Sequence, residues 1–192
     1  HWCMLCGKVT DEAATGLLPI YQWQRAQQWF TEHGTAEEQA QIDLYLGRAY
    51  VEDGEYDKAM QIYADALQLA KEHQAYNVAG YICAYMADLY GFRDITSECL
   101  KKREEACEFF KKAENYKSYA YSLKDLAGEW AILDSFACTI PLLQKADSIS
   151  QLLHNKNLTA AIANAFALIY EMQGKYNEAE TAYLKAISTR SE

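Results

Sequence analysis

Residues 46–66 read LGRAYVEDGEYDKAMQIYADA, and the spacing of this segment returns further along the chain. Residues 166–186, FALIYEMQGKYNEAETAYLKA, match it position by position 120 residues later, which is three periods of 40. Two intermediate copies, 86–106 and 126–146, keep much of the spacing but lose the glycine in the middle. A period of this length predicts a solenoid, in which each unit buries its apolar face against its neighbours.

Each unit has the residue pattern of a helical hairpin. Apolar and small residues recur at i, i+3, i+4 and i+7, which predicts amphipathic helices, and no alternating run is long enough for a strand. Thr35 and Glu38 predict a capping box at the start of one helix, and Gly54 and Gly174 predict helix ends, because glycine enters left-handed conformations cheaply. Pro141 is tolerated only in a first turn, so its helix is expected to start late, around Thr139.

The repeats predict one continuous solenoid with no separate domains. Counting back 40 residues from Tyr63 and Ala66 reaches Trp23 and Ala26, so a degenerate repeat precedes the first clear copy. Because the chain starts inside the pattern, we expect a piece of a longer protein; the alternative is that Trp2 and Trp29 pack as an irregular cap. The expected divisions are a degenerate or truncated repeat at 1–34, repeat 1 at 35–74, repeat 2 at 75–114 (irregular), repeat 3 at 115–154 (irregular) and repeat 4 at 155–192.

The charge balance argues against nucleic acid as a partner. Lys and Arg number 18 against 27 Asp and Glu, which gives a net charge of -9, the wrong sign for a phosphate-binding surface. No apolar run approaches the roughly 18 residues that a membrane span requires. We therefore expect a soluble segment without a transmembrane helix.

The cysteines favour packing over chemistry. Cys83, Cys99 and Cys107 take helical positions that are apolar in most other copies, and free cysteine behaves as a small buried hydrophobe. Unpaired cysteines lean toward a reducing, cytoplasmic compartment, although the compartment stays open. A zinc site usually needs four ligands, so we expect no metal and no cofactor from the one ligand-like cluster, His1, Cys3 and Cys6.

The repeated residues resemble a known family. Leu46, Gly47, Tyr50, Ala59 and Tyr63, followed by Ala66, resemble the consensus of the tetratricopeptide repeat, whose period is about 34 residues. The longer period of 40 is similar to the variants in kinesin light chains and in bacterial peptide-sensing regulators. The resemblance implies an all-α fold, a right-handed α-α superhelix of helical hairpins.

The resemblance also implies a place for a ligand. In this family the first helices of successive units line a concave groove, and rigid tyrosines with a few charges suit a peptide or a partner's helix. The alternative, that these tyrosines only fill the interior, stays open. The groove positions implied by the register are Leu44, Tyr45, Arg48, Tyr81, Tyr85, Asp88, Tyr121, Lys124, Asp125, Asn164 and Leu168.

These observations favour a binding module over an enzyme. The sequence contains no Gly-rich phosphate loop, GxSxG or HExxH, and its four histidines lie far apart. The chaperone-type clamp that holds a C-terminal carboxylate is also missing, since Leu44, Tyr85, Tyr121 and Asp125 stand at its positions. The leading hypothesis is a non-catalytic protein-protein interaction module. One alternative is the sensory or regulatory region of a larger bacterial signalling or transcription-regulating protein, and another is self-association through the uncapped C-terminal repeat.

Overall fold

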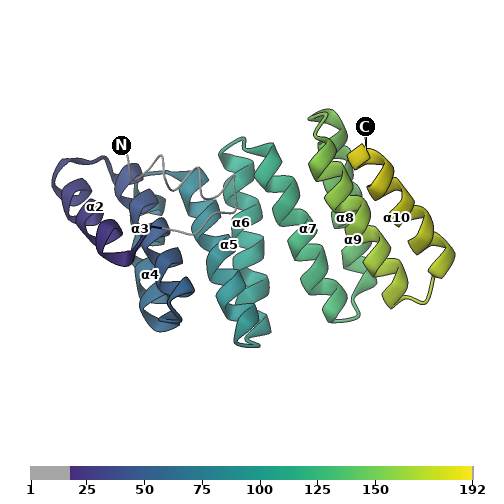
Figure 1. Ribbon diagram of the computed structural model, residues 1–192, viewed down its shortest axis with the longest axis horizontal. Coiled ribbons are helices and arrows are strands. Elements are labelled where there is room, and N and C mark those ends of the chain that lie inside the picture. Colours follow the sequence, from purple (N-terminus) through teal and green to yellow (C-terminus); the bar gives the residue numbers. More distant parts are fainter. Residues whose placement is uncertain (1–17, 192) are drawn as a thin grey trace. The chain divides into compact units, whose positions relative to one another are not determined.

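The computed structural model describes residues 18–191, which form nine α-helices and no strand within that range (Figure 1). After the first helix, every helix but the last is 17 residues long, and three residues connect each to the next. The helices are α2 (Ile20–His33), α3 (Ala36–Glu52), α4 (Tyr56–Glu72), α5 (Tyr76–Phe92), α6 (Thr96–Lys112), α7 (Tyr116–Ile132), α8 (Phe136–Leu152), α9 (Lys156–Met172) and α10 (Tyr176–Ser191).

The chain divides into two compact units, and the boundary falls within α6, between Lys102 and Arg103. In unit 1, α2 packs on α3, α3 on α4 and α4 on α5, and α3 also contacts α5. In unit 2, α7, α8, α9 and α10 pack in the same order, and α7 also contacts α9. Within each unit, the first helices of successive repeats therefore contact one another, and the second helix of each repeat packs against these first helices. The all-α repeat fold expected from the sequence is confirmed.

The turns that follow α3 and each later helix up to α9 share one backbone geometry. Gly54 and Gly174 have φ values of 79° and 70°, as the two glycines predicted. At each turn, the residue after the left-handed one donates its N–H to the carbonyl five positions back, as Glu55 does to Tyr50 at 2.8 Å. This is the hydrogen-bond pattern of a Schellman motif. Five residues without glycine's freedom adopt the same left-handed conformation at the same 20-residue spacing: Gln74, Asp94, Glu114, Asp134 and His154.

Side-chain caps start several helices. Thr35 accepts a hydrogen bond from the backbone N–H of Glu38 at 3.2 Å, and the Glu38 carboxylate accepts the N–H of Thr35 at 2.9 Å. The predicted capping box is therefore present. Asn115 and Asn155 cap α7 and α9 in a similar way, each accepting the N–H three residues on.

Small residues let neighbouring helices approach one another. Ala59 and Ala66 on α4 are 0% and 1% exposed, so there is no room for larger side chains at these positions. Gly47 on α3 faces the ring of Tyr63 on α4, and this ring is fully buried. At the start of unit 1, Trp23 stacks on Tyr45 with ring centroids 5.2 Å apart.

The expectation for Pro141 is wrong. Helix α8 begins at Phe136, three residues before the expected start, and Pro141 lies inside it. The first turn is held by the N–H groups of Cys138 and Thr139, which both donate to the carbonyl of Ser135, at 3.0 and 3.2 Å. The Thr139 hydroxyl adds a third bond to the same carbonyl at 3.1 Å. These bonds form N-terminal to the proline, so the helix starts at the position set by the repeat.

Candidate functional site

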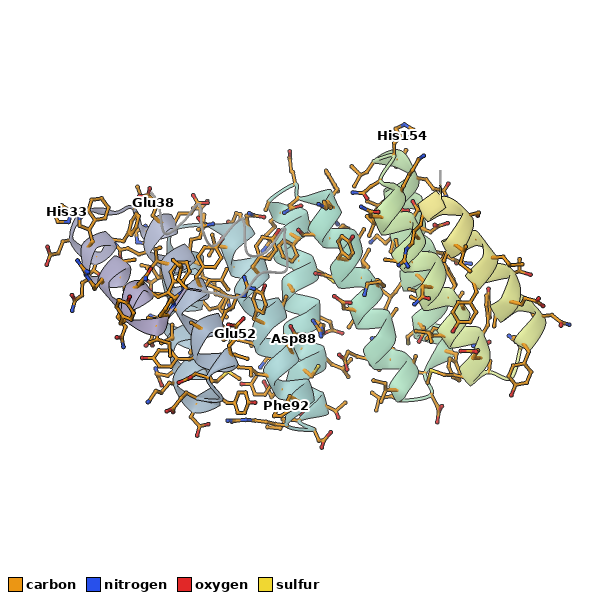
Figure 2. The ribbon with its side chains drawn as sticks, in the orientation of Figure 1. His33, Glu38, Glu52, Asp88, Phe92 and His154 are labelled. Atoms are coloured by element: carbon orange, nitrogen blue, oxygen red, sulfur yellow. The ribbon has the colours of Figure 1, made fainter. Side chains whose placement is uncertain are left out.

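A pocket of about 400 Å³ opens between the first helices of unit 1, and we call it the unit 1 pocket. Helices α3 and α5 form its walls, and α4 supplies its floor. Asp88 and Phe92 lie about one helical turn apart at the C-terminal end of α5 (Figure 2). The lining residues are Arg48, Val51, Glu52, Tyr56, Tyr63, Tyr85, Asp88, Leu89 and Phe92.

Three aromatic and charged groups stack in this pocket, one from each of the three helices. The rings of Tyr63 and Tyr85 lie nearly parallel, with centroids 6.3 Å apart. The guanidinium of Arg48 lies over the Tyr85 ring, 5.0 Å from its centroid, in a cation–π arrangement. The stack fixes the orientation of Tyr85 and leaves Arg48 at the pocket surface.

The floor of the pocket carries a buried hydroxyl that no described residue hydrogen-bonds. Tyr63 is 0% exposed, and its hydroxyl makes no hydrogen bond within residues 18–191. Burial is the main cause that raises the Tyr63 pKa far above its ordinary value, so the hydroxyl stays protonated. The adjacent Tyr85 and Asp88 raise this pKa further, while Arg48 opposes the shift. Tyr63 therefore keeps both a donor and an acceptor available.

Aromatic rings and carboxylates surround the opening of the pocket. Tyr56 and Phe92 lie 5.2 Å apart between centroids, tilted by 46°, and Phe92 is 69% exposed. Glu52, on α3, is exposed beside them. Next to the opening, Arg93 pairs with Asp57 at 2.6 Å, which ties the end of α5 to the start of α4.

Unit 2 holds a pocket of about 340 Å³ at the equivalent place, which we call the unit 2 pocket. Eight of its residues are the counterparts, 80 positions on, of residues in the unit 1 pocket. The counterparts are apolar or small where the first set is polar. Gly128, Ile132, Leu143, Ala165 and Leu168 stand for Arg48, Glu52, Tyr63, Tyr85 and Asp88. The repeat therefore builds the same pocket twice with different chemistry.

The groove residues implied by the resemblance divide into three groups. Leu44 and Tyr45 are 4% and 2% exposed and lie in the core of unit 1, so they cannot line a binding surface. Tyr81 and Asn164 are exposed, and Tyr121 is half-buried, outside either pocket. The other six line the pockets: Arg48, Tyr85 and Asp88 in unit 1, and Lys124, Asp125 and Leu168 in unit 2.

Lys124 and Asp125 form an ion pair at the edge of the unit 2 pocket. Arg103 lies 3.5 Å from Glu129 in the same lining, and both side chains are largely buried. These charges are therefore paired within the unit, and the free surface of this pocket is apolar.

Spacing alone missed six residues of the unit 1 pocket: Val51, Glu52, Tyr56, Tyr63, Leu89 and Phe92. In the sequence Tyr63 is only one of the consensus positions of the repeat. One signal was present in the sequence, because Tyr63 is paired with a glycine at position 47, while Leu143 is paired with an alanine at 127. The pairing of a large tyrosine with a glycine, in place of a leucine with an alanine, indicates that α3 and α4 pack around the Tyr63 side chain and its hydroxyl.

No metal-binding cluster accompanies these pockets in the part of the chain that the structure describes. No group of three or more His, Cys, Asp and Glu there could hold a metal ion, and the cluster of His1, Cys3 and Cys6 lies outside the described residues. His33 ends α2, and His154 lies in the turn after α8 (Figure 2). Within residues 18–191, no helix combines the length and the apolar character that crossing a bilayer would demand.

Comparison with known proteins identifies the repeat. Models of the tetratricopeptide repeat match residues 46–74 and residues 159–192. A search of curated proteins finds no significant match.

Several solved structures share the fold. The chain is similar to BtubC (BKLC) from P. vanneervenii, with a TM-score of 0.74 and 17% identity over 88% of this chain and 74% of that one. It is also similar to a putative kinesin light chain with nearly identical TPR-like repeats from Podosopora anserina, with a TM-score of 0.70 and 13% identity over 98% and 93%. The apo form of RapI gives a TM-score of 0.66 and 15% identity over 90% and 76%. At these identities the likeness concerns the fold alone.

Proposed function

The chain belongs to the tetratricopeptide-repeat family, and on that premise we propose that it binds a peptide, or an extended segment of a partner protein, along its first helices. The binding surface in unit 1 is the exposed side of α3 and α5, and in unit 2 it is the exposed side of α7 and α9. We call these surfaces the first-helix faces. Proteins of this family are generally non-catalytic interaction modules.

One observation carries the proposal: both units hold a pocket at the same place in the repeat. Arg48 and Asp88 line the first pocket, and their counterparts Gly128 and Leu168 line the second. Two pockets at the same place in the repeat, lined by different side chains, suit a ligand that presents different side chains to successive repeats.

Exposed apolar side chains support a macromolecular ligand for unit 2. Ile132, Leu168 and Met172 line the unit 2 pocket and are 72%, 47% and 51% exposed. A cluster of exposed apolar side chains around a hollow is typical of a protein-binding surface. A peptide that covers these side chains removes them from water, which favours binding by the hydrophobic effect.

The test starts from peptides selected against the purified chain from a random display library. Tyr85→Ala and Tyr121→Ala are expected to weaken the selected peptides by about tenfold or more, because buried interface aromatics dominate binding. Tyr176→Ala, an exposed tyrosine at the start of the second helix α10, is the matched control and leaves affinity unchanged. Circular dichroism verifies that each variant is folded. Undiminished affinity in both groove variants refutes the location.

A second candidate, self-association through α10, is favoured by the exposure of Ile187. Ile187 is 62% exposed, whereas Leu67, its counterpart on α4, is 5% exposed in unit 1. Leu184, one turn before Ile187, is 60% exposed. In unit 1 the next helix, α5, packs on α4, so an equivalent helix from a second copy suits the face of α10. Sedimentation equilibrium over a range of concentrations tests this, and Ile187→Asp is expected to abolish any dimer. A monomer at every concentration rejects the candidate.

A further inference from the structure

The Tyr63 hydroxyl at the floor of the unit 1 pocket, which finds no hydrogen-bond partner within residues 18–191, points to a specific occupant. Buried polar groups in folded proteins are almost always hydrogen-bonded, so an exception inside a pocket needs an explanation. The ring cannot turn away to find a partner, because Gly47 lies against it on one side and Tyr85 stacks on it. The missing partner is therefore expected to come from a ligand that enters the pocket.

The charge of the pocket limits which ligand is suitable. Two carboxylates, Glu52 and Asp88, and one guanidinium, Arg48, line it, so the lining has a net negative charge. Unit 1 as a whole is acidic, since residues 18–102 contain seven Lys and Arg against thirteen Asp and Glu. This field attracts cations and repels anions.

The opening of the pocket suits a long apolar stem. The rings of Tyr56 and Phe92 meet at an angle of 46°, and Val51 and Leu89 complete the apolar part of the lining. Lysine and arginine bury their methylene stems along such surfaces while the charged head reaches polar groups. Aromatic faces near the head add cation–π attraction.

We propose that the unit 1 pocket binds a long basic side chain, lysine or arginine, of the partner peptide. The stem lies against Tyr56 and Phe92, and the cationic head reaches the carboxylates of Glu52 and Asp88 and donates to the hydroxyl oxygen of Tyr63. This inference rests on the proposed function, because it names the side chain that the first-helix face of unit 1 selects. The unit 2 pocket, with Ile132 and Leu168 at the positions of the two carboxylates, has no such preference.

The probes are four blocked amino acids: the N-acetyl methylamides of lysine, arginine, norleucine and glutamate. Norleucine has the stem of lysine without the charge, and glutamate has the opposite charge. Each is titrated into the full chain labelled with ¹³C in its tyrosine and phenylalanine rings, and the ring signals of Tyr63, Tyr85 and Phe92 are followed by NMR. Single blocked residues bind weakly, so the titration extends to concentrations on the order of tens of millimolar.

Lysine and arginine are expected to shift these ring signals saturably, with norleucine about tenfold weaker and glutamate without effect. The double variant Glu52→Gln, Asp88→Asn is expected to weaken lysine binding about tenfold and to leave norleucine unchanged. Asp53→Asn is the control for nonspecific charge effects, because it removes one carboxylate from the residue beside Glu52 but outside the pocket lining. Tyr63→Phe is expected to weaken lysine about threefold.

Three results overturn the inference: equal binding of norleucine and lysine, stronger binding of glutamate, or no saturable shift with any probe. Its failure is distinguishable from that of the proposed function. Library-selected peptides that depend on Tyr85 but carry no basic residue sustain the proposed function and reject this inference. If lysine binds as expected while selected peptides neither compete with it nor depend on Tyr85, the pocket stands and the peptide-binding function fails.

Discussion

Gly47 on α3 and Tyr63 on α4 fit together so closely that no side chain can be added at position 47. A β-carbon on Gly47 would meet three carbons of the Tyr63 ring, the farthest at 2.9 Å. In unit 2 the counterparts Ala127 and Leu143 belong to one core cluster, where a smaller side chain leaves room for a methyl group. The glycine thus allows a large ring at position 63, and the ring places a hydroxyl at the floor of the unit 1 pocket.

Gly47→Ala is expected to lower the free energy of unfolding by about 1–3 kcal/mol, because the added methyl overpacks the interface of α3 and α4. Gly128→Ala is the matched control in a first helix, since a β-carbon there meets no other atom of the described residues within 4 Å. That variant is expected to gain roughly 0.5–1 kcal/mol from the lower backbone entropy of alanine. Urea unfolding measures both, and a stabilising Gly47→Ala contradicts the packing.

Tyr63→Phe is expected to raise the free energy of unfolding by roughly 1 kcal/mol, because it deletes a buried hydroxyl that lacks a hydrogen-bond partner in the described chain. The comparison is Tyr45→Phe, another buried tyrosine, whose hydroxyl accepts a hydrogen bond from Gln41 at 3.4 Å. Removing that bond is expected to bring no gain in stability. Thermal unfolding of the two variants decides the matter, and a clear loss in Tyr63→Phe shows that the hydroxyl already has a partner.

The helical repeat was predictable because it depends on spacing alone. Gly54 and Gly174 marked two turns, and the period extended the pattern to the copies between them. The turn at Gln74 was not predictable from its own residues, since glutamine has no preference for a left-handed backbone. The neighbouring helices impose that conformation, so it belongs to the tertiary structure.

The binding surface was predictable only in part. Spacing placed Leu44 and Arg48 on one face of α3, one turn apart, yet Leu44 is buried and Arg48 lines a pocket. The difference depends on the side of α3 against which α5 packs, and helical periodicity does not contain this direction. The depth of Tyr63 depends in turn on how closely α4 approaches α3, which the pairing with Gly47 sets.

Gln74→Gly is expected to stabilise the chain by up to about 1 kcal/mol. Gln74 has a φ of 57°, a left-handed conformation that costs an L-residue roughly 1–2 kcal/mol, and relief of this strain outweighs the entropy cost of glycine. Gln68→Gly, at an exposed position within α4, controls for composition and is expected to lose about 1 kcal/mol. Chemical denaturation of the two variants gives the comparison. The same loss at both positions indicates that the turn is not strained.

The cysteines of the described residues are expected to differ in reactivity. Burial raises the pKa of Cys107 to about 12, with Asp125 adding to the shift, so almost no thiolate is present at neutral pH. Cys83 and Cys99 are also buried, whereas Cys138 is exposed. Alkylation with iodoacetamide at pH 8 should modify Cys138 at least about tenfold faster than the three buried thiols, as mapped by peptide mass spectrometry. Rapid labelling of Cys107 in the folded chain contradicts its burial, and labelling in urea provides the control.

Asp43→Asn is expected to stabilise the chain at neutral pH and to have little effect in acid. Burial is the main cause that raises the Asp43 pKa above 3.8, and Asp65 adds to it, while the hydrogen bond from Gln27 at 2.7 Å works against it. A carboxyl whose pKa is higher in the folded state favours folding when it is protonated. Its contribution to the free energy of unfolding is therefore lost as the pH rises from the pKa of the unfolded state through the pKa of the folded state. Asparagine keeps an oxygen for Gln27 without the charge. The gain should therefore be absent below pH of about 4 and reach its full size by neutrality. Urea unfolding across this pH range measures it, with the exposed Asp53→Asn as control. A gain that is largest in acid, or equal in the two variants, shows that the Asp43 carboxylate is not destabilised by its burial.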